Sequence, residues 1–387
     1  MTGVSFTNLV IVAAAAFTAP LALGLFPKLP LPAVVLEIVQ RDSSWPFGSR
    51  VGEGRLLLFL AGLEIDLERV PRRLLGLAGL AFALSLSLAL SVGYALRQAG
   101  QIRSPLFVGI VLSATALGLV APVLKDAGQS EGEFGQLVLA GSTIADFGTV
   151  ILLSMLFSQK AAGVGARLAL LGSFTVLVAA VGLAVARAGR SIKLSRVLVR
   201  LQDTTAQVRV RGAVLFLIGF VGLAERFGLQ AILGAFMAGV VLRIVDRDTA
   251  THPHFRLKLE GIGYGFLIPI FFVSSGLQFD FSALLSSAST AIGVPVFLLA
   301  LLLVRGIPAL LYRGVLGDRR TLAAGLLQAT SLGFIVAAVQ IGIALGQISE
   351  ATAAALIGAG LLSVMLFPLL ALMILGGREE REAKNER

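Results

Sequence analysis

Long apolar stretches separated by short polar connections dominate the hydrophobic pattern of this 387-residue chain. A helix that crosses a bilayer needs about 20 predominantly apolar residues, with a range of roughly 17–25. The pattern predicts thirteen helices, at residues 8–26, 30–41, 51–67, 72–97, 104–126, 132–158, 164–187, 206–225, 229–245, 258–278, 283–313, 319–346 and 350–375. We therefore expect an all-α polytopic membrane protein whose termini lie on opposite sides of the membrane.

The composition is typical of a membrane protein and excludes sites that depend on cysteine. Hydrophobic residues make up 57% of the chain and charged residues 14%, whereas soluble domains carry about 25% charged residues. The sequence has no cysteine, which excludes disulfides and cysteine-ligated metals. The first apolar stretch lacks a preceding basic segment and a convincing cleavage site, so we interpret it as a retained span.

Lysine and arginine are divided unevenly between the two sides of the expected helices. Of the 32 basic residues, eight fall in loops on the N-terminal side and 23 on the other side, while Arg305 lies inside an apolar stretch. Because basic loops stay in the cytoplasm, the N-terminus is expected outside and the C-terminus in the cytoplasm. The net charge of +10 thus reflects membrane topology, and no nucleic-acid partner is expected. The Arg-rich connection at 187–211 could also contact anionic membrane lipid.

One carboxylate, Asp146, lies inside the apolar run at residues 134–157. A carboxylate near the middle of a membrane costs roughly 2.5–3.5 kcal/mol on insertion scales, so it needs a function or a partner. Arg305, deep in the run at 294–312, is the residue best able to interact with it. The two charges indicate an ion or proton pathway. For Asp146 the alternative is a structural ion pair with Arg305. For Arg305 we expect a structural or charge-balancing role in the core, with direct participation in transport as the alternative.

Two fragments recur along the chain at almost the same offset. Residues 62–67 (GLEIDL) match residues 276–281 (GLQFDF) at an offset of 214, and residues 114–118 (ATALG) match residues 329–333 (ATSLG) at an offset of 215. The matches pair the third expected helix with the tenth and the fifth with the twelfth. Partners seven helices apart run in opposite directions, which is typical of the inverted repeats of secondary transporters. The repeats would be helices 1–6 and 8–13, with helix 7 as a linker.

The fifth and twelfth helices carry polar and small residues in mid-span. Non-helical backbone at membrane depth is tolerated where protein or a cavity surrounds it, and such broken helices direct their dipoles and free carbonyls at an ion. Small and polar residues can instead mark close helix packing. The repeat favours two broken, crossing helices, whose polar residues are Ser113, Thr115, Gln328, Thr330 and Ser331.

These residues define a candidate ion site, because hard monovalent cations prefer oxygen ligands. Asp146 is the expected metal ligand, and Ser142, four residues earlier, shares its helix face. Thr115, the backbone around Ala114 and, as a weaker candidate, Thr143 complete the expected set. If a cation and a proton compete for Asp146, alternating access produces exchange without ATP and without a cofactor.

The chain resembles the monovalent cation:proton antiporter superfamily, particularly its Kef-like and NapA-like bacterial branch. The resemblance rests on the Asp146 helix and on four segments, which are residues 59–66 (FLAGLEID), 113–116 (SATA) leading to 122–125 (PVLK), 234–239 (GAFMAG) and 269–273 (PIFFV). It covers essentially the whole membrane region.

This resemblance implies a homodimer in the bacterial inner membrane that works by an elevator-like movement. The dimerisation domain would comprise residues 1–70 and 206–281, and the mobile core residues 71–160 and 282–376. Residues 161–205 would form the linker helix and a cytoplasmic connection, and residues 377–387 a charged cytoplasmic tail.

Two departures from the family pattern bear on stoichiometry. Ala145 stands where members usually place Asp, Asn or Gln, and Arg305 stands where members that exchange two protons for one sodium often carry lysine. Arginine stays charged at physiological pH and cannot readily release a transported proton. Both departures favour electroneutral exchange of one Na⁺ or K⁺ for one H⁺, with electrogenic exchange as the alternative.

Two other classes of function fit the sequence less well. An ion channel would share the apolar body and the buried charges, but the inverted repeat favours a carrier. A membrane-embedded enzyme would need a nucleophile with its base or a metal motif such as H-E-x-x-H, and the sequence contains neither.

Overall fold

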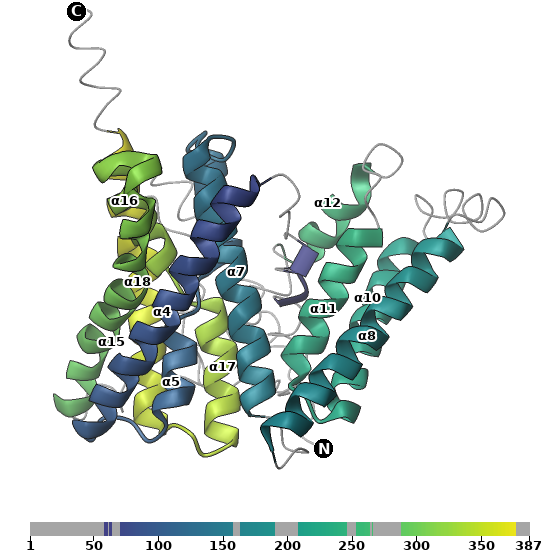
Figure 1. Ribbon diagram of the computed structural model, residues 1–387, viewed down its shortest axis with the longest axis horizontal. Coiled ribbons are helices and arrows are strands. Elements are labelled where there is room, and N and C mark those ends of the chain that lie inside the picture. Colours follow the sequence, from purple (N-terminus) through teal and green to yellow (C-terminus); the bar gives the residue numbers. More distant parts are fainter. Residues whose placement is uncertain are drawn as a thin grey trace, which may run out of the picture. The chain divides into compact units, whose positions relative to one another are not determined.

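A computed structural model describes residues 58–60, 62–63, 70–157, 163–189, 208–245, 253–263, 265 and 288–376 of the chain (Figure 1). Every regular element in these ranges is a helix, and six stretches within them are long and apolar enough to cross a membrane. The prediction of an all-α polytopic membrane protein is confirmed. The helices expected at 8–26 and 30–41 and the tail lie outside the described residues, as does the repeat fragment at 276–281.

The described helices follow the expected ones closely. Those expected at 72–97, 132–158, 164–187, 206–225, 229–245 and 350–375 all end within two residues of the observed bounds. The helices of the first half are α4 (Arg72–Gln98), α5 (Pro105–Leu112), α6 (Leu117–Asp126), α7 (Glu133–Leu156) and α8 (Val164–Gly189). Those of the second half are α10 (Val208–Phe227), α11 (Ala231–Val245), α12 (Pro253–Ile262), α15 (Ala288–Gly306), the 3₁₀ helix η3 (Pro308–Tyr312), α16 (Arg313–Ala329), α17 (Gly333–Ala344) and α18 (Glu350–Gly376).

The chain divides into two compact units. The first comprises Met1–Gly48, Asp66–Thr149 and Phe272–Arg387, and the second comprises Ser49–Ile65 and Val150–Phe271. The division falls inside α7, so the helix that carries Asp146 contributes to both. The assignment of residue ranges to a dimerisation domain and a mobile core stays a prediction.

Two helices of the first unit are broken where the sequence predicts breaks. The helix expected at 104–126 is interrupted between Leu112 and Leu117, and the one expected at 319–346 between Ala329 and Gly333. Each break therefore separates two half-helices, α5 from α6 and α16 from α17. The signal for both breaks was the combination of polar and small residues at mid-span with the repeated fragments.

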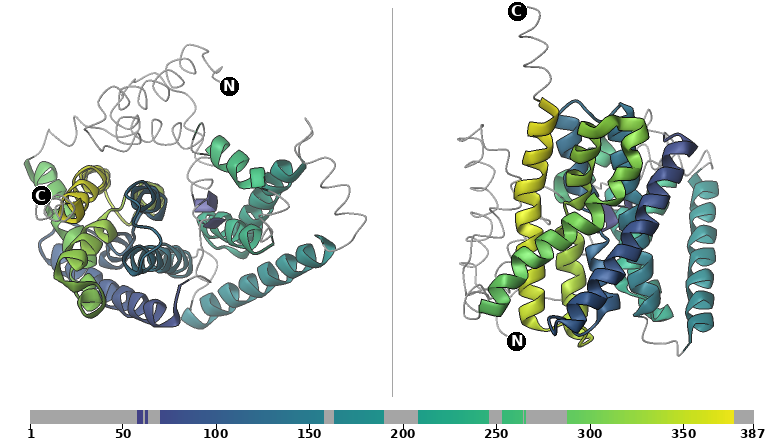
Figure 2. Two further views of the ribbon diagram at one scale, coloured as in Figure 1. Left: turned by 90° about the horizontal axis from the view of Figure 1, so that it is seen from above. Right: turned by 60° about the vertical axis from the view of Figure 1, so that its left-hand side comes forward.

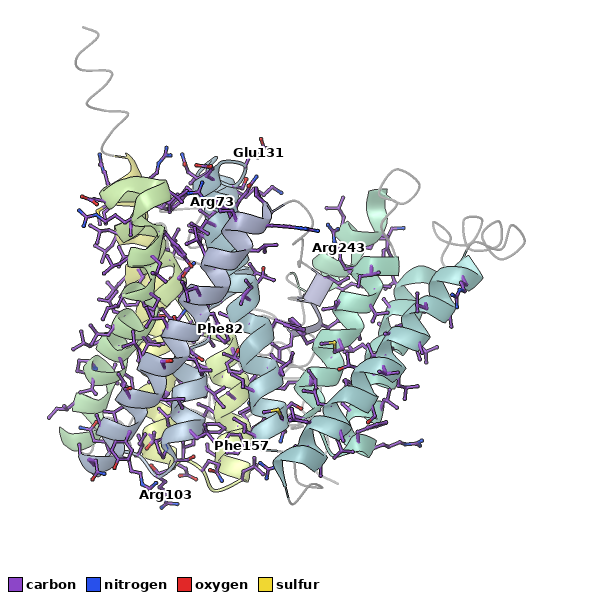
Figure 3. All side chains as sticks on the ribbon, viewed as in Figure 1. Arg73, Phe82, Arg103, Glu131, Phe157 and Arg243 are labelled. Carbon is purple, nitrogen blue, oxygen red and sulfur yellow. The ribbon has the colours of Figure 1, made fainter. Side chains whose placement is uncertain are left out.

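The first unit contains an inverted structural repeat, in which the order α4, α5, α6, α7 recurs as α15, α16, α17, α18. The starts of α6 and α17, Leu117 and Gly333, are 216 residues apart, close to the offset of the sequence fragments. In Figures 1 and 3, α4 and α7 run from the upper edge to the lower edge, whereas α15 and α18 run upward. Helix α15 packs against α18, α16 and α4 (Figure 2).

The helix expected at 283–313 differs from the structure at its C-terminal end. Helix α15 ends at Gly306, and η3 carries the chain to Tyr312, because Pro308 has no N–H with which to continue an α-helix. Gly317 then adopts a φ of 72°, a left-handed conformation that favours glycine. The regular part of α16 therefore begins after Gly317, near the expected start at residue 319.

Glycine allows a very close helix contact in the second unit. A Cβ atom on Gly239 of α11 would lie 2.0 Å from the carbonyl oxygen of Phe59, and one on Gly62 would lie 2.3 Å from the carbonyl oxygen of Phe236. The two backbones thus touch directly, as is common where membrane helices pack through small residues.

This contact predicts that Gly239→Ala lowers the thermal stability of the protein. The added methyl group meets backbone, which cannot move aside as a side chain can, and overpacking of this kind typically costs about 1–3 kcal/mol. The matched control is Gly219→Ala in α10, where an added Cβ meets nothing within 4 Å. Thermal unfolding of both purified variants in detergent measures the difference, and equal midpoints would contradict the close contact.

Candidate functional site

The two breaks of the first unit hydrogen-bond to each other. The Ala116 amide donates to the carbonyl oxygen of Thr330 at 2.9 Å, and the Thr115 hydroxyl donates to the carbonyl oxygen of Gln328 at 2.8 Å. Thr115, Gln328 and Thr330 are fully or almost fully buried. The segments between the half-helices, residues 113–116 and 330–332, therefore form what we call the crossing.

The side chain of Asp146, a residue of α7, contacts the N-terminus of α6. Its Oδ2 accepts a hydrogen bond from the amide of Leu117, the first residue of that helix, at 3.2 Å. The N-cap residue, Ala116, has no side-chain oxygen with which to bind the free amides of the first turn. Asp146 is 6% exposed, so its charge faces the positive end of the α6 dipole from within the protein.

The side chain of Arg305, a residue of α15, reaches the C-terminal end of α16. Its Nε donates to the Thr115 hydroxyl at 3.0 Å and to the Gln328 carbonyl oxygen at 3.4 Å. Its Nη1 donates to the Ser85 hydroxyl at 3.1 Å, and its Nη2 to the Gly141 carbonyl oxygen at 3.4 Å. The Gln328 carbonyl belongs to the last turn of α16, where carbonyls lack helical partners, so the guanidinium offsets the negative end of that helix.

The two buried charges interact at a distance rather than through a direct hydrogen bond. Asp146 acts electrostatically on Arg305, but within the described residues all four hydrogen bonds of the guanidinium go to neutral oxygen atoms. This geometry favours the charge-balancing interpretation of Arg305 over a structural ion pair. Asp146 consequently does not depend on Arg305 for its hydrogen bond to α6.

A second layer of side chains holds Gln328 in place. Its Nε2 donates to the Tyr312 hydroxyl at 3.1 Å, and a Cβ on Gly141 would lie only 2.2 Å from that Nε2. Gly141 therefore leaves the space that the Gln328 amide fills against α7. Sequence reasoning missed Tyr312, Gly141 and Ser85. A serine inside the apolar helix α4 was a usable signal, whereas a glycine among 44 was not.

The remaining predicted residues divide into two groups. The Ser113 and Thr330 hydroxyls donate to carbonyl oxygens of the preceding helical turn, those of Ile110 and Leu326. In contrast, the buried Ser142 and Ser331 hydroxyls have no hydrogen-bond partner among the described residues. Ala114 and Thr143 are also buried. Ser142, one turn before Asp146, is thus an oxygen available to a bound ion.

The chain matches the family model described as "Sodium/hydrogen exchanger, transmembrane" over residues 55–372. It is 30% identical to the protein YjbQ of Bacillus subtilis (strain 168), over 99% of this chain and 65% of that protein. It is 27% identical to a Na(+)/H(+) antiporter of Enterococcus hirae, over 59% of this chain and 58% of that protein. The matched regions span less than two thirds of the length of these two relatives.

The fold is similar to that of the sodium proton antiporter MjNhaP1 from Methanocaldococcus jannaschii. The TM-score is 0.65 at 18% sequence identity, and the superposition covers 96% of this chain and 99% of that chain. At this identity the likeness concerns the fold alone.

The neutral oxygens around Arg305 predict that Ser85→Ala destabilises the protein. Loss of this acceptor leaves a buried guanidinium N–H unsatisfied, which costs about 1–3 kcal/mol. Ser87→Ala is the matched control, because Ser87 is an exposed serine of the same helix that donates to the carbonyl oxygen of Ala83. Thermal unfolding compares the two variants, and a Ser85→Ala midpoint as high as that of the control would remove Ser85 from the Arg305 cluster.

Proposed function

This chain belongs to the sodium/hydrogen exchanger family, and on that premise we propose that it is a secondary active transporter that exchanges a monovalent cation for H⁺. The observation that carries the proposal is the position of Asp146, a buried carboxylate bound to the first amide of α6 beside two crossing broken helices. A half-helix directed at an ion near the middle of the membrane is typical of secondary transporters.

Asp146 is the shared site of the cation and the proton. In the cation-bound state a carboxylate oxygen and the Ser142 hydroxyl contribute ligands, and free backbone oxygens around Ala114 complete the set. In the proton-bound state the neutral carboxylic acid has no charge with which to hold the cation. Because each ion excludes the other, the site returns across the membrane loaded with one of them, and the gradient of one ion drives the other. Thr115 contributes mainly by holding Arg305, since its hydroxyl already binds Arg305 and Gln328.

The fixed charge of Arg305 supports one-for-one, electroneutral exchange. With Asp146 empty, the two charges sum to zero. With either Na⁺ or H⁺ bound to Asp146, the sum is one positive charge in both cases. A charge carried in one direction with the cation is therefore carried back with the proton, because Arg305 keeps its own proton. Electrogenic exchange would need a second titrating group that moves with Asp146.

The cation is Na⁺ or K⁺, and the name of the Enterococcus hirae relative supports Na⁺. The protein works as a homodimer in the bacterial inner membrane, with the N-terminus outside and the C-terminus in the cytoplasm. The uneven distribution of Lys and Arg supports this orientation. The inverted repeat with two broken helices supports a carrier rather than a channel.

Asp146→Asn is expected to abolish coupled exchange while the protein still folds. The amide is close in size to the carboxylate, but it has no negative charge to attract a cation and takes up no proton at physiological pH. Proteoliposomes with an internal pH dye measure proton flux driven by Na⁺ or K⁺ gradients. Asp318→Asn, at an exposed aspartate paired with Arg313, is the control and should exchange like the wild type. Proton-coupled cation flux in Asp146→Asn would remove Asp146 as the shared site.

An imposed membrane potential distinguishes electroneutral from electrogenic exchange. One net charge moved per cycle couples about 2.3 kcal/mol per 100 mV to transport, which is a roughly 50-fold change in the equilibrium cation ratio. We expect the Na⁺ ratio reached at a fixed pH gradient to be the same at 0 and at about 100 mV. Liposomes without protein control for leakage. A ratio that shifts by more than tenfold would establish electrogenic exchange.

A further inference from the structure

Ser363 occupies the position in the second repeat that Asp146 occupies in the first. Helices α7 and α18 both begin with a glutamate, Glu133 and Glu350, and 13 residues separate Glu133 from Asp146 as they separate Glu350 from Ser363. Both side chains are buried. The inverted repeat therefore has a carboxylate at this position in one half and a neutral hydroxyl in the other.

The two side chains also make related contacts. Asp146 accepts a hydrogen bond from the Leu117 amide, at the end of the first break. The Ser363 Oγ accepts one from the Ser331 amide, inside the second break, at 3.1 Å, and lies 2.7 Å from the carbonyl oxygen of Gly360, to which it donates. Each helix thus uses one side chain to hold the broken helix of its own repeat.

The second break lies directly against α18. A Cβ on Gly360 would be 2.9 Å from the carbonyl oxygen of Ser331, so the Ser331 backbone occupies the place of a side chain on that helix. The N-cap of α17, Leu332, has no side-chain cap and a φ of −143° with a ψ of −57°. The Ser363 hydroxyl therefore stabilises this irregular segment through a side-chain hydrogen bond.

A short chain of contacts leads from Ser363 to the ion site. Ser363 binds the amide of Ser331, and the preceding residue, Thr330, accepts a hydrogen bond from the amide of Ala116. The residue after Ala116 is Leu117, whose amide binds Asp146. The position of the amide that faces Asp146 thus depends on a backbone that Ser363 holds.

We propose that Ser363 is a positioning residue for ion exchange, which acts on Asp146 through the Ser331 and Thr330 backbone and supplies a neutral group at the repeat-related position. The proposal rests on the function proposed above. On this proposal the protein has one titrating site because the two repeats differ at this position. The Ser363 hydroxyl binds the broken helix of its repeat, as Asp146 does, but it exchanges no ion.

The test is the cation dependence of exchange in proteoliposomes for three variants. Ser363→Ala loses the acceptor for the Ser331 amide, so we expect the KM for Na⁺ to rise roughly fivefold or more, with the maximal rate within about twofold of wild type. Ser363→Thr keeps the hydroxyl and is expected to restore the wild-type KM. The matched control is Thr352→Ala in the same helix, whose hydroxyl bonds to Ser349 and Gln101 rather than to the crossing.

A KM of Ser363→Ala equal to that of Thr352→Ala overturns the inference, as does a loss of maximal rate with an unchanged KM. If Ser363→Ala does not fold, Ser363→Cys tests the same point, because a thiol is a weak acceptor of similar size. A raised KM in Ser363→Cys supports the inference, and a wild-type KM overturns it. A wild type without cation-coupled proton flux would instead contradict the proposed function itself.

Discussion

Backbone groups inside a membrane must find hydrogen-bond partners within the protein, and the arrangement of the first unit follows from this constraint. Two broken helices leave N–H and C=O groups at four internal helix ends. The breaks satisfy part of this need by bonding to each other through Ala116 and Thr330. Asp146, Arg305 and Ser363 supply further partners from three different helices. The energetic role that these side chains share is thus to make an irregular backbone stable at membrane depth.

The charges at the crossing are matched to the helix ends that they face. Asp146 binds an amide at a positive helix end, and Arg305 binds a carbonyl oxygen at a negative one. The difference lies in how fully each is enclosed. Arg305 is surrounded by neutral acceptors from α4, α7, α16 and the first break. Ser142, one turn before Asp146, has a hydroxyl without a hydrogen-bond partner in the part of the chain that the structure describes. The permanent charge of Arg305 is thus fully enclosed by hydrogen-bond acceptors, whereas the Asp146 carboxylate lies near a hydroxyl oxygen that could still bind a ligand.

The sequence alone predicted several of the residues that gather at the crossing, because these residues are rare in their surroundings. A carboxylate and a guanidinium in apolar stretches, and polar residues at mid-span, stand out without any structure. The fold followed from the hydrophobic pattern and from two repeated fragments. Ser363 is also a polar residue at mid-span, but its role depends on its contact with the Ser331 amide, which the sequence does not show. Tyr312 could not be recognised, because its role depends on Gln328 on another helix. Gly141 was equally hidden, since its contribution is the absence of a side chain at one contact. The end of α15 was misjudged because hydrophobicity continues through Pro308 although the α-helix does not.

The space that Gly141 leaves on α7 has a mechanical consequence. The Gln328 amide occupies the place of a side chain on α7, and the Gly141 carbonyl oxygen binds Arg305 in the same place. A rotation of α7 about its own axis would drive Ala140 or Ser142 into that amide, and a slide along the axis would break both contacts. These contacts therefore oppose a movement of α7 by itself against α16. A movement that preserves both contacts has to carry α7 and α16 together, so Gly141 joins these two helices into one mechanical element.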